Sequence, residues 1–162
     1  MRIAPALLLP AAWLALTGAA APSLTDAAEC RLPCAEAHAL LATLPTTKHV
    51  DQSVAPGRRI ANYYAGPMPR AFGFQASSFG STDMLDDDSE RFMVITSFKL
   101  PFDQVRAAAI KVHGEAACPI GDRATFCMGT VRTEPDWTVS MLISEDDGEV
   151  SIGCAYRRDP TK

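Results

Sequence analysis

Five cysteines are the residues of this chain best suited to chemistry. They are Cys30, Cys34, Cys118, Cys127 and Cys154. In an oxidising compartment, thiols serve mainly as structural cross-links. The segment between Cys118 and Cys127 contains Pro-Ile-Gly-Asp at 119–122 and can turn the chain back on itself. Closing this loop would stabilise the fold by roughly 2.5 to 3 kcal/mol in the chain-entropy model, so we predict a Cys118–Cys127 disulfide.

The other three cysteines leave the second disulfide open. Cys30 and Cys34 can bridge each other across the start of a helix, or either can reach Cys154. Cys154 alternates with apolar residues along a predicted strand over 150–156. We prefer a buried Cys154 outside any disulfide, with a bond from Cys154 to an N-terminal cysteine as the next interpretation.

Redox and metal chemistry at these cysteines are not favoured. Three residues separate Cys30 from Cys34, so the chain lacks the C-x-x-C motif of redox dithiols and haem attachment. The spacing of Cys30, Cys34 and His38 would place two thiolates and an imidazole along one helical stripe, a ligand set suited to zinc. Pro33 belongs in the first helical turn and leaves Cys30 outside the helix. We therefore predict no metal site there.

The most acidic segment, residues 81–90, offers oxygen ligands for a hard cation. Asp86, Asp88 and Glu90 have the alternate spacing that places carboxylates on one side of the chain, and calcium prefers such ligands. The segment lacks the central glycine and the terminal glutamate of an EF-hand loop. We keep these three residues as calcium candidates and interpret the segment itself as a solvated acidic loop.

No catalytic motif accompanies the other histidines. The sequence has no G-x-S-x-G, H-E-x-x-H, P-loop or dinucleotide-binding glycine pattern. His49 is isolated, and His113 falls in the last turn of a predicted helix, where a positive charge interacts favourably with the helix dipole. We therefore predict no catalytic residue and no cofactor.

A tyrosine pair and the loop after it form the candidate interaction surface. Its residues are Tyr63, Tyr64, Pro67, Met68 and Arg70. Tyrosines provide broad contact area at low entropic cost, and prolines stiffen a loop. Because neighbouring residues of a strand point to opposite faces, one of the two tyrosines must face the core.

The elements that position these residues follow from hydrophobic periodicity. Apolar residues at helical spacing predict helices over 34–44 and 102–113, with Gly114 as the C-cap of the second. Strands are expected over 58–64, 71–79, 92–100, 125–132, 137–144 and 150–156. This order predicts a two-layer α+β fold, in which two helices pack on one face of an antiparallel sheet of about five or six strands.

The N-terminus has the pattern of a secretory signal peptide. Arg2 precedes an apolar run, and small residues at 18–20 suit a signal peptidase, so we expect cleavage after Ala20. We expect a flexible leader over 21–29, a single domain over 30–160, and a periplasmic or secreted location without a membrane span. The net charge of −4 becomes more negative when Arg2 is removed, which disfavours nucleic acid as a partner.

These observations favour a non-catalytic binding module of the cell envelope with a protein or glycan partner. A small sheet stabilised by disulfides and lacking a catalytic motif suits recognition better than chemistry. Two alternatives remain open: a hydrolase whose catalytic groups are scattered through the fold, and an exported protein that binds calcium or another metal.

Overall fold

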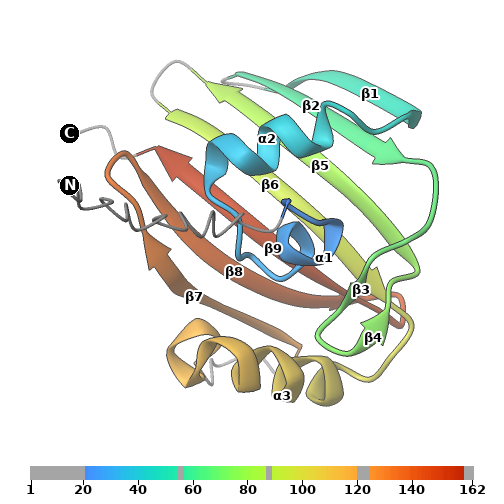
Figure 1. Ribbon diagram of the computed structural model, residues 1–162, viewed down its shortest axis with the longest axis vertical. Coiled ribbons are helices and arrows are strands. Elements are labelled where there is room, and N and C mark those ends of the chain that lie inside the picture. Colours follow the sequence, from blue (N-terminus) through green and yellow to red (C-terminus); the bar gives the residue numbers. More distant parts are fainter. Residues whose placement is uncertain (1–20, 55–56, 87–88, 120–124, 159–162) are drawn as a thin grey trace, which may run out of the picture.

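The protein has a mixed α+β fold built on one large antiparallel sheet. The computed structural model describes residues 21–54, 57–86, 89–119 and 125–158, and the predicted signal segment lies outside them. Seven strands form the sheet, in the order β1-β2-β5-β6-β9-β8-β7, rather than the five or six expected. They are β1 (Thr46–Val54), β2 (Gly57–Tyr64), β5 (Ser78–Asp86), β6 (Ser89–Phe98), β7 (Phe126–Thr133), β8 (Trp137–Asp146) and β9 (Glu149–Arg158) (Figure 1).

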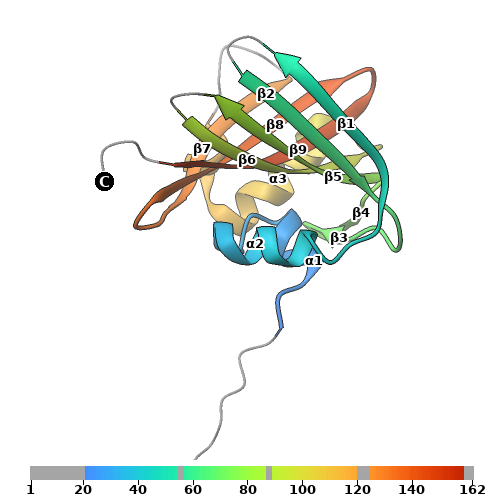
Figure 2. The ribbon, with the colours of Figure 1, turned by 90° about the horizontal axis from the view of Figure 1, so that it is seen from above.

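The helices and one small hairpin complete the chain. The helices are α1 (Leu24–Ala28), α2 (Cys34–Leu41) and α3 (Phe102–His113), and the 3-10 turn η1 spans Glu115–Ala117. The hairpin joins β3 (Arg70–Ala71) to β4 (Phe74–Gln75). Figure 2 shows α1 and α2 on the same side of the sheet, and Figure 1 shows α3 beside the end that carries β7.

Hairpins assemble each half of the sheet, and one long-range pairing joins the halves. β8 and β9 meet at a two-residue turn in which Asp147 and Gly148 both have positive φ, 49° and 75°. This is the geometry of the primed turns that match the twist of antiparallel strands. β6 pairs with β9 along its length, so the strand before α3 lies beside the last strand of the chain.

The acidic segment forms strands rather than the predicted loop. Residues 81–86 belong to β5, which pairs with β2 on one side and β6 on the other. Phe79 and Ser81 are buried on this strand, and Asp83 is half-buried. Aspartate is depleted in strands, but pairing and burial on both sides outweigh that local preference. Residues 46–54, which lie between the first predicted helix and the first predicted strand, form β1, which pairs with β2.

The predicted strand over 71–79 is divided in two by a tight turn. Phe72 and Gly73 both have positive φ, 53° and 85°, and they turn β3 back onto β4. The sheet strand β5 starts only at Ser78. A left-handed residue such as Phe72 interrupts an extended strand, although alternation alone predicts continuity.

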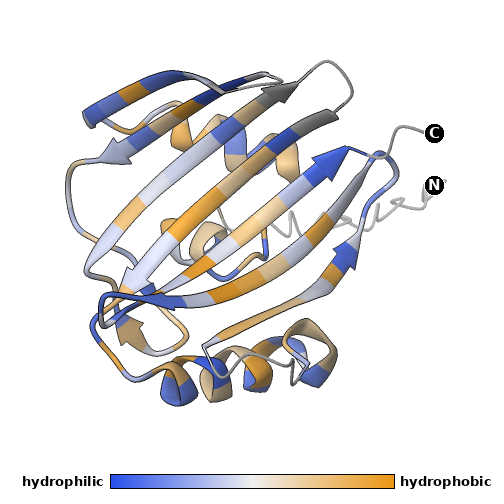
Figure 3. Cartoon of the chain, turned by 180° about the vertical axis from the view of Figure 1, so that it is seen from behind, coloured by the Kyte–Doolittle hydropathy of each residue, from blue (hydrophilic) through white to orange (hydrophobic). Residues whose placement is uncertain are grey.

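The two faces of the sheet have different neighbours. The face toward α1 and α2, named here the covered face, carries the largest fully buried side chains, which include Tyr156, Phe98, Met141, Ile143 and Ile152. α3 adds Phe102, Val105 and Ala109 to the same core cluster. The opposite face, named here the open face, carries the alternate residues of each strand. Figure 3 looks onto the open face, with α1 and α2 behind the sheet.

The leader segment contains a helix instead of the flexible chain expected. Ser23 Oγ accepts a hydrogen bond from the Asp26 amide, and the Asp26 carboxylate accepts one from the Ser23 amide. This reciprocal capping box satisfies amides that the helix itself cannot pair. Ala27 and Ala28 are fully buried, and α1 contacts β6 and β9. The small alanine side chains let the helix approach the sheet closely.

Side chains from the sheet bind the chain between α1 and α2. The Arg132 guanidinium donates to the carbonyl oxygens of Cys30 and Arg31 at 3.1 and 3.0 Å, and also to that of Leu32. The Tyr156 hydroxyl donates to Leu32 O at 2.9 Å. These bonds satisfy carbonyls that would otherwise lose their water partners near the core, so they hold the N-terminal segment against the covered face.

Two disulfides cross-link the fold. Cys118 and Cys127 are bonded with their Cα atoms 5.1 Å apart, in the pairing that the spacing predicts. Cys30 is bonded to Cys154 with a Cα separation of 5.2 Å. The preferred interpretation of Cys154 as a thiol outside a disulfide is therefore wrong, and so is a Cys30–Cys34 bridge. Cys30 follows α1, which packs against β9, and is fully buried. Cys34 is buried and belongs to neither disulfide.

Candidate functional site

The open face of the sheet contains a cavity of about 490 Å³. It extends across β5, β6, β9, β8 and β7. Its walls include three methionines, Met84, Met93 and Met128. Met128 is 55% exposed, unusually high for a large apolar side chain. The volume lies in the range of roughly 300 to 1,000 Å³ that small-molecule sites occupy.

The strand register explains why this part of the sheet is hollow. One cross-strand row contains Thr82, Met93, Ala155, Ser140 and Thr130 in neighbouring positions. Four of these five side chains are short, so they rise only a little above the sheet. The longer side chains at the margins therefore enclose a space above the short ones.

Gly153, beside this row, leaves room for the Met93 side chain to lie against the sheet. A Cβ on Gly153 would come within 2.6 Å of the Met93 sulfur, a separation that requires something to move. Gly153 is directly opposite Ile95 and Leu142 on the neighbouring strands, and both of these side chains are half-buried on the open face. Apolar surface therefore continues beyond the cavity.

Two arginines lie at one margin of the cavity. Arg91 and Arg157 are directly opposite each other on β6 and β9, and both line the cavity. Both residues are exposed. Like charges directly opposite in an antiparallel pair repel each other.

The predicted interaction surface is divided between the core and the solvent. Tyr64 is 8% exposed, and its hydroxyl lies 2.7 Å from Ser81 Oγ, while Met68 packs against the core cluster. Both residues therefore have structural roles. Tyr63 is 43% exposed, and Pro67 and Arg70 are also exposed. Tyr63 lines a smaller hollow of about 270 Å³ on the open face.

The histidines make separate local contacts. The His38 ring stacks on Phe92 with centroids 3.8 Å apart, and its Nε2 lies 3.9 Å from Asp83 Oδ1. Burial raises the pKa of the Asp83 carboxyl, although His38 partly opposes this effect. His113 Nε2 lies 2.6 Å from Glu29 O, so this histidine connects α3 to the N-terminal segment in addition to its place in the last helical turn.

The structure rules out one candidate metal site, and the ligands of the other lie outside the described side chains. Cys30 is in a disulfide and cannot supply a thiolate to a site with Cys34 and His38. Asp88 lies outside the described residues, as do the side chains of Asp86 and Glu90. Within the described part of the chain, no three His, Cys, Asp or Glu side chains are grouped so as to hold a metal ion.

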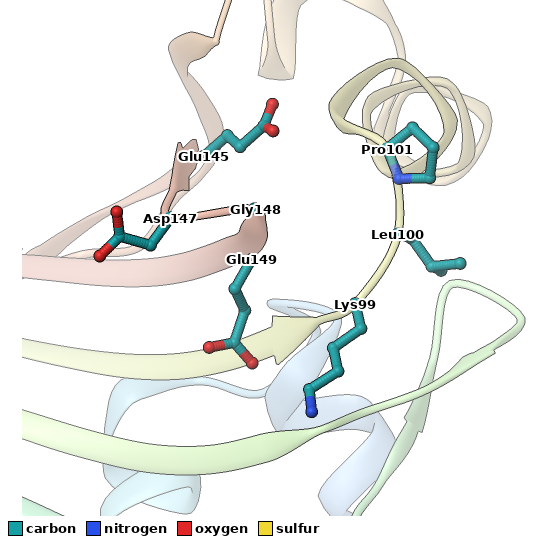
Figure 4. Close-up of a pocket in the computed structure, with 7 residues that line it drawn as sticks. All are labelled: Lys99, Leu100, Pro101, Glu145, Asp147, Gly148 and Glu149. Atoms are coloured by element: carbon teal, nitrogen blue, oxygen red, sulfur yellow. The ribbon is translucent and has the colours of Figure 1, made fainter.

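The β8–β9 turn borders another hollow, of about 530 Å³. Figure 4 shows Glu145, Asp147 and Glu149 near this turn, with Lys99 across from them. The three carboxylates point in different directions, so they do not converge on a common point. Cation binding requires several oxygen atoms directed at one position. We therefore interpret the acidic residues of the β8–β9 turn as a solvated hairpin end.

Comparisons with known proteins assign no family. No family model matches the chain, and no curated protein or solved structure matches it. In the described residues, no helix combines the length and the apolar character needed to cross a bilayer.

The interaction surface predicted from the sequence does not include the cavity on the open face. Its signal was present in two strands, because Met93 and Ile95 alternate with the core residues of β6, and Leu142 does so on β8. An antiparallel strand with one solvated face usually places polar residues there. Apolar residues on both faces of β6 and β8 could therefore have indicated a binding surface on the open face.

Proposed function

We propose that this protein is an exported, non-catalytic binding protein of the cell envelope, and that a ligand occupies the cavity on the open face. The observation that carries the proposal is the hollow of about 490 Å³ whose lining includes Met84, Met93 and Met128. Methionine side chains are flexible and polarisable, and they adapt to varied apolar ligands. A concave apolar site with a few polar groups is the usual form of a small-molecule site.

The lining chemistry supports binding rather than catalysis. The cavity is lined by threonine and serine hydroxyls, methionines and two arginines, and its lining includes no His, Cys, Asp or Glu among the described residues. Nucleophilic catalysis by a hydroxyl needs a neighbouring base to accept its proton. The hydroxyls of Thr130 and Ser140 have no such partner among the lining residues.

Two features support export to the periplasm or the extracellular space. The first is the signal-peptide pattern over residues 1–20. The second is the pair of disulfides, which form and persist in oxidising compartments. Intact mass of the protein recovered from an exported fraction tests this part of the proposal, because retention of the first twenty residues would contradict it.

An uncharged apolar dye, Nile red, tests the cavity itself. We expect saturable fluorescence enhancement with the oxidised mature protein and its loss in Ala155→Trp, since Ala155 lies at the centre of the lining. Ser144→Trp is the matched control. Ser144 is a half-buried residue on β8, and it lies outside the cavity lining. No enhancement in the native protein, or equal enhancement in both variants, would contradict the proposal.

A protein or glycan partner at the exposed tyrosine stays a prediction from the sequence. Tyr63 offers the exposed aromatic surface that such a partner would need. Affinity capture from an envelope extract, compared with capture by Tyr63→Ala, tests this prediction. Identical sets of captured proteins and glycans for both forms would contradict it.

A further inference from the structure

We infer that Met128 is a site of oxidative modification, and that conversion of its thioether to a sulfoxide by a hydroperoxide weakens binding in the open-face cavity. The second half of this inference rests on the proposed function, because it concerns the ligand of the same cavity. Three observations carry it: the exposure of Met128 beside better-covered methionines, its place on the last strand of the sheet, and its place in the cavity lining.

Met128 is the most accessible thioether in the described part of the chain. Its exposed fraction is 55%, whereas Met68, Met84 and Met93 are half-buried and Met141 is completely buried. Oxidation of a thioether requires contact between its sulfur and the oxidant, so the rate follows exposure. A hydroperoxide should therefore react at Met128 before it reacts at the other four described methionines.

The strand arrangement accounts for this exposure. β7 is the last strand of the sheet, and Met128 is directly opposite Leu142 of β8. The 3-10 turn η1 packs against β7, where a Cβ on Gly129 would collide with the Ala116 carbonyl oxygen. Neighbouring residues of a strand point to opposite faces. η1 therefore covers β7 from the side of Gly129 and leaves Met128 open to solvent.

The modification changes the chemistry of the cavity wall, which Met128 helps to form. One oxygen atom passes from the hydroperoxide to the sulfur as the O–O bond breaks, and the hydroperoxide leaves as water or an alcohol. The sulfur is oxidised and the peroxide is reduced, so no further co-reactant is needed. The sulfoxide is polar, and its burial against an apolar ligand without a hydrogen-bond partner costs free energy. Binding should therefore weaken.

Peptide mass mapping tests the site of modification. The mature protein, with both disulfides formed, is treated with dilute hydrogen peroxide for increasing times. We expect one oxygen atom to be added at Met128 at least about tenfold faster than at the buried Met141, and also faster than at Met84 and Met93. Earlier or equal oxidation of Met84 or Met93 would overturn the assignment of the site.

Nile red binding, measured after the peroxide is removed, tests the consequence. We expect the dissociation constant of the dye to rise about tenfold when Met128 is oxidised, because an unpaired polar group then lies against the dye. Met128→Leu is the matched control, since leucine is apolar and has no sulfur. Each protein is compared with itself before and after treatment, and the dissociation constant of this variant should not change. The control also accounts for oxidation of the buried Cys34 thiol.

Two results would overturn the control of binding by Met128. One is an unchanged dissociation constant in the protein oxidised at Met128. The other is an equal rise in Met128→Leu, which would place the effect at another side chain. The untreated protein would still bind the dye in both cases, which supports the proposed function. Absence of dye binding by the untreated protein would overturn the proposed function together with this consequence, whereas mass mapping would still decide the site of oxidation.

Discussion

The covered and open faces of the sheet come from the same strands but have different roles. Met141 on the covered face of β8 is completely buried, whereas Met128 on the open face of neighbouring β7 is 55% exposed. The covered face meets α1, α2 and α3, so its apolar residues contribute to stability. The open face carries the exposed Met128, and exposed apolar surface of this kind commonly marks a binding site. Under the proposed function, alternation divides stability and recognition between the two faces of one sheet.

The disulfides offer the largest expected effect, because one of them fixes the covering segment to the sheet. Cys30 and Cys154 are 124 residues apart, whereas Cys118 and Cys127 are 9 apart. In the chain-entropy model, loss of the long loop costs about 5 kcal/mol and loss of the short loop about 2.7 kcal/mol. Urea unfolding of the two double alanine variants measures these losses.

The matched comparison is between Cys30→Ala with Cys154→Ala and Cys118→Ala with Cys127→Ala. A larger loss of stability in the short-loop variant would show that the N-terminal segment is held mainly by the hydrogen bonds of Arg132 and Tyr156. It would also show that the long disulfide adds little to the covered face.

The two methionines give a direct comparison of the faces. Met141→Ala removes a fully buried side chain and should lower the free energy of unfolding by about 2 to 5 kcal/mol. Met128→Ala changes an exposed side chain and should alter it by less than about 0.5 kcal/mol. Urea unfolding curves measure both changes in the free energy of unfolding, through their midpoints when their slopes are equal. Similar losses in the two variants would refute the division of roles between the faces.

The smallest effect concerns the charge of Asp83 at the margin of the covered face. Burial raises the pKa of its carboxyl, and the pairing with His38 opposes this only in part. Above about pH 3.9, the usual aspartate pKa, the unfolded chain releases its proton before the folded protein does. The folded state is therefore progressively disfavoured as the pH rises through the pKa of folded Asp83.

The variant Asp83→Asn removes this titration. We expect it to gain stability relative to the native protein between about pH 3 and about pH 7, as linkage requires. Urea unfolding of both proteins at the two pH values gives the difference. A relative loss of stability in the variant as the pH rises would mean that the charged contact with His38 outweighs the burial of Asp83.

Local sequence patterns determined several elements correctly. The apolar spacing from Phe102 to the C-cap at Gly114 predicted α3, and alternation predicted the strands that form β6, β8 and β9. The short spacing of Cys118 and Cys127 likewise corresponds to a disulfide. These features depend on contacts between residues close in the chain, and such contacts are visible in a single sequence.

Contacts between distant residues decided the rest. The acidic residues of β5 are in a strand because β2 and β6 pair with it on both sides. Cys30 meets Cys154 only because α1 packs on β9. The cavity exists because short side chains from separate strands fall into one row beside longer methionines. A sequence specifies which way each residue of a strand points, but strand order and register determine which distant residues become neighbours.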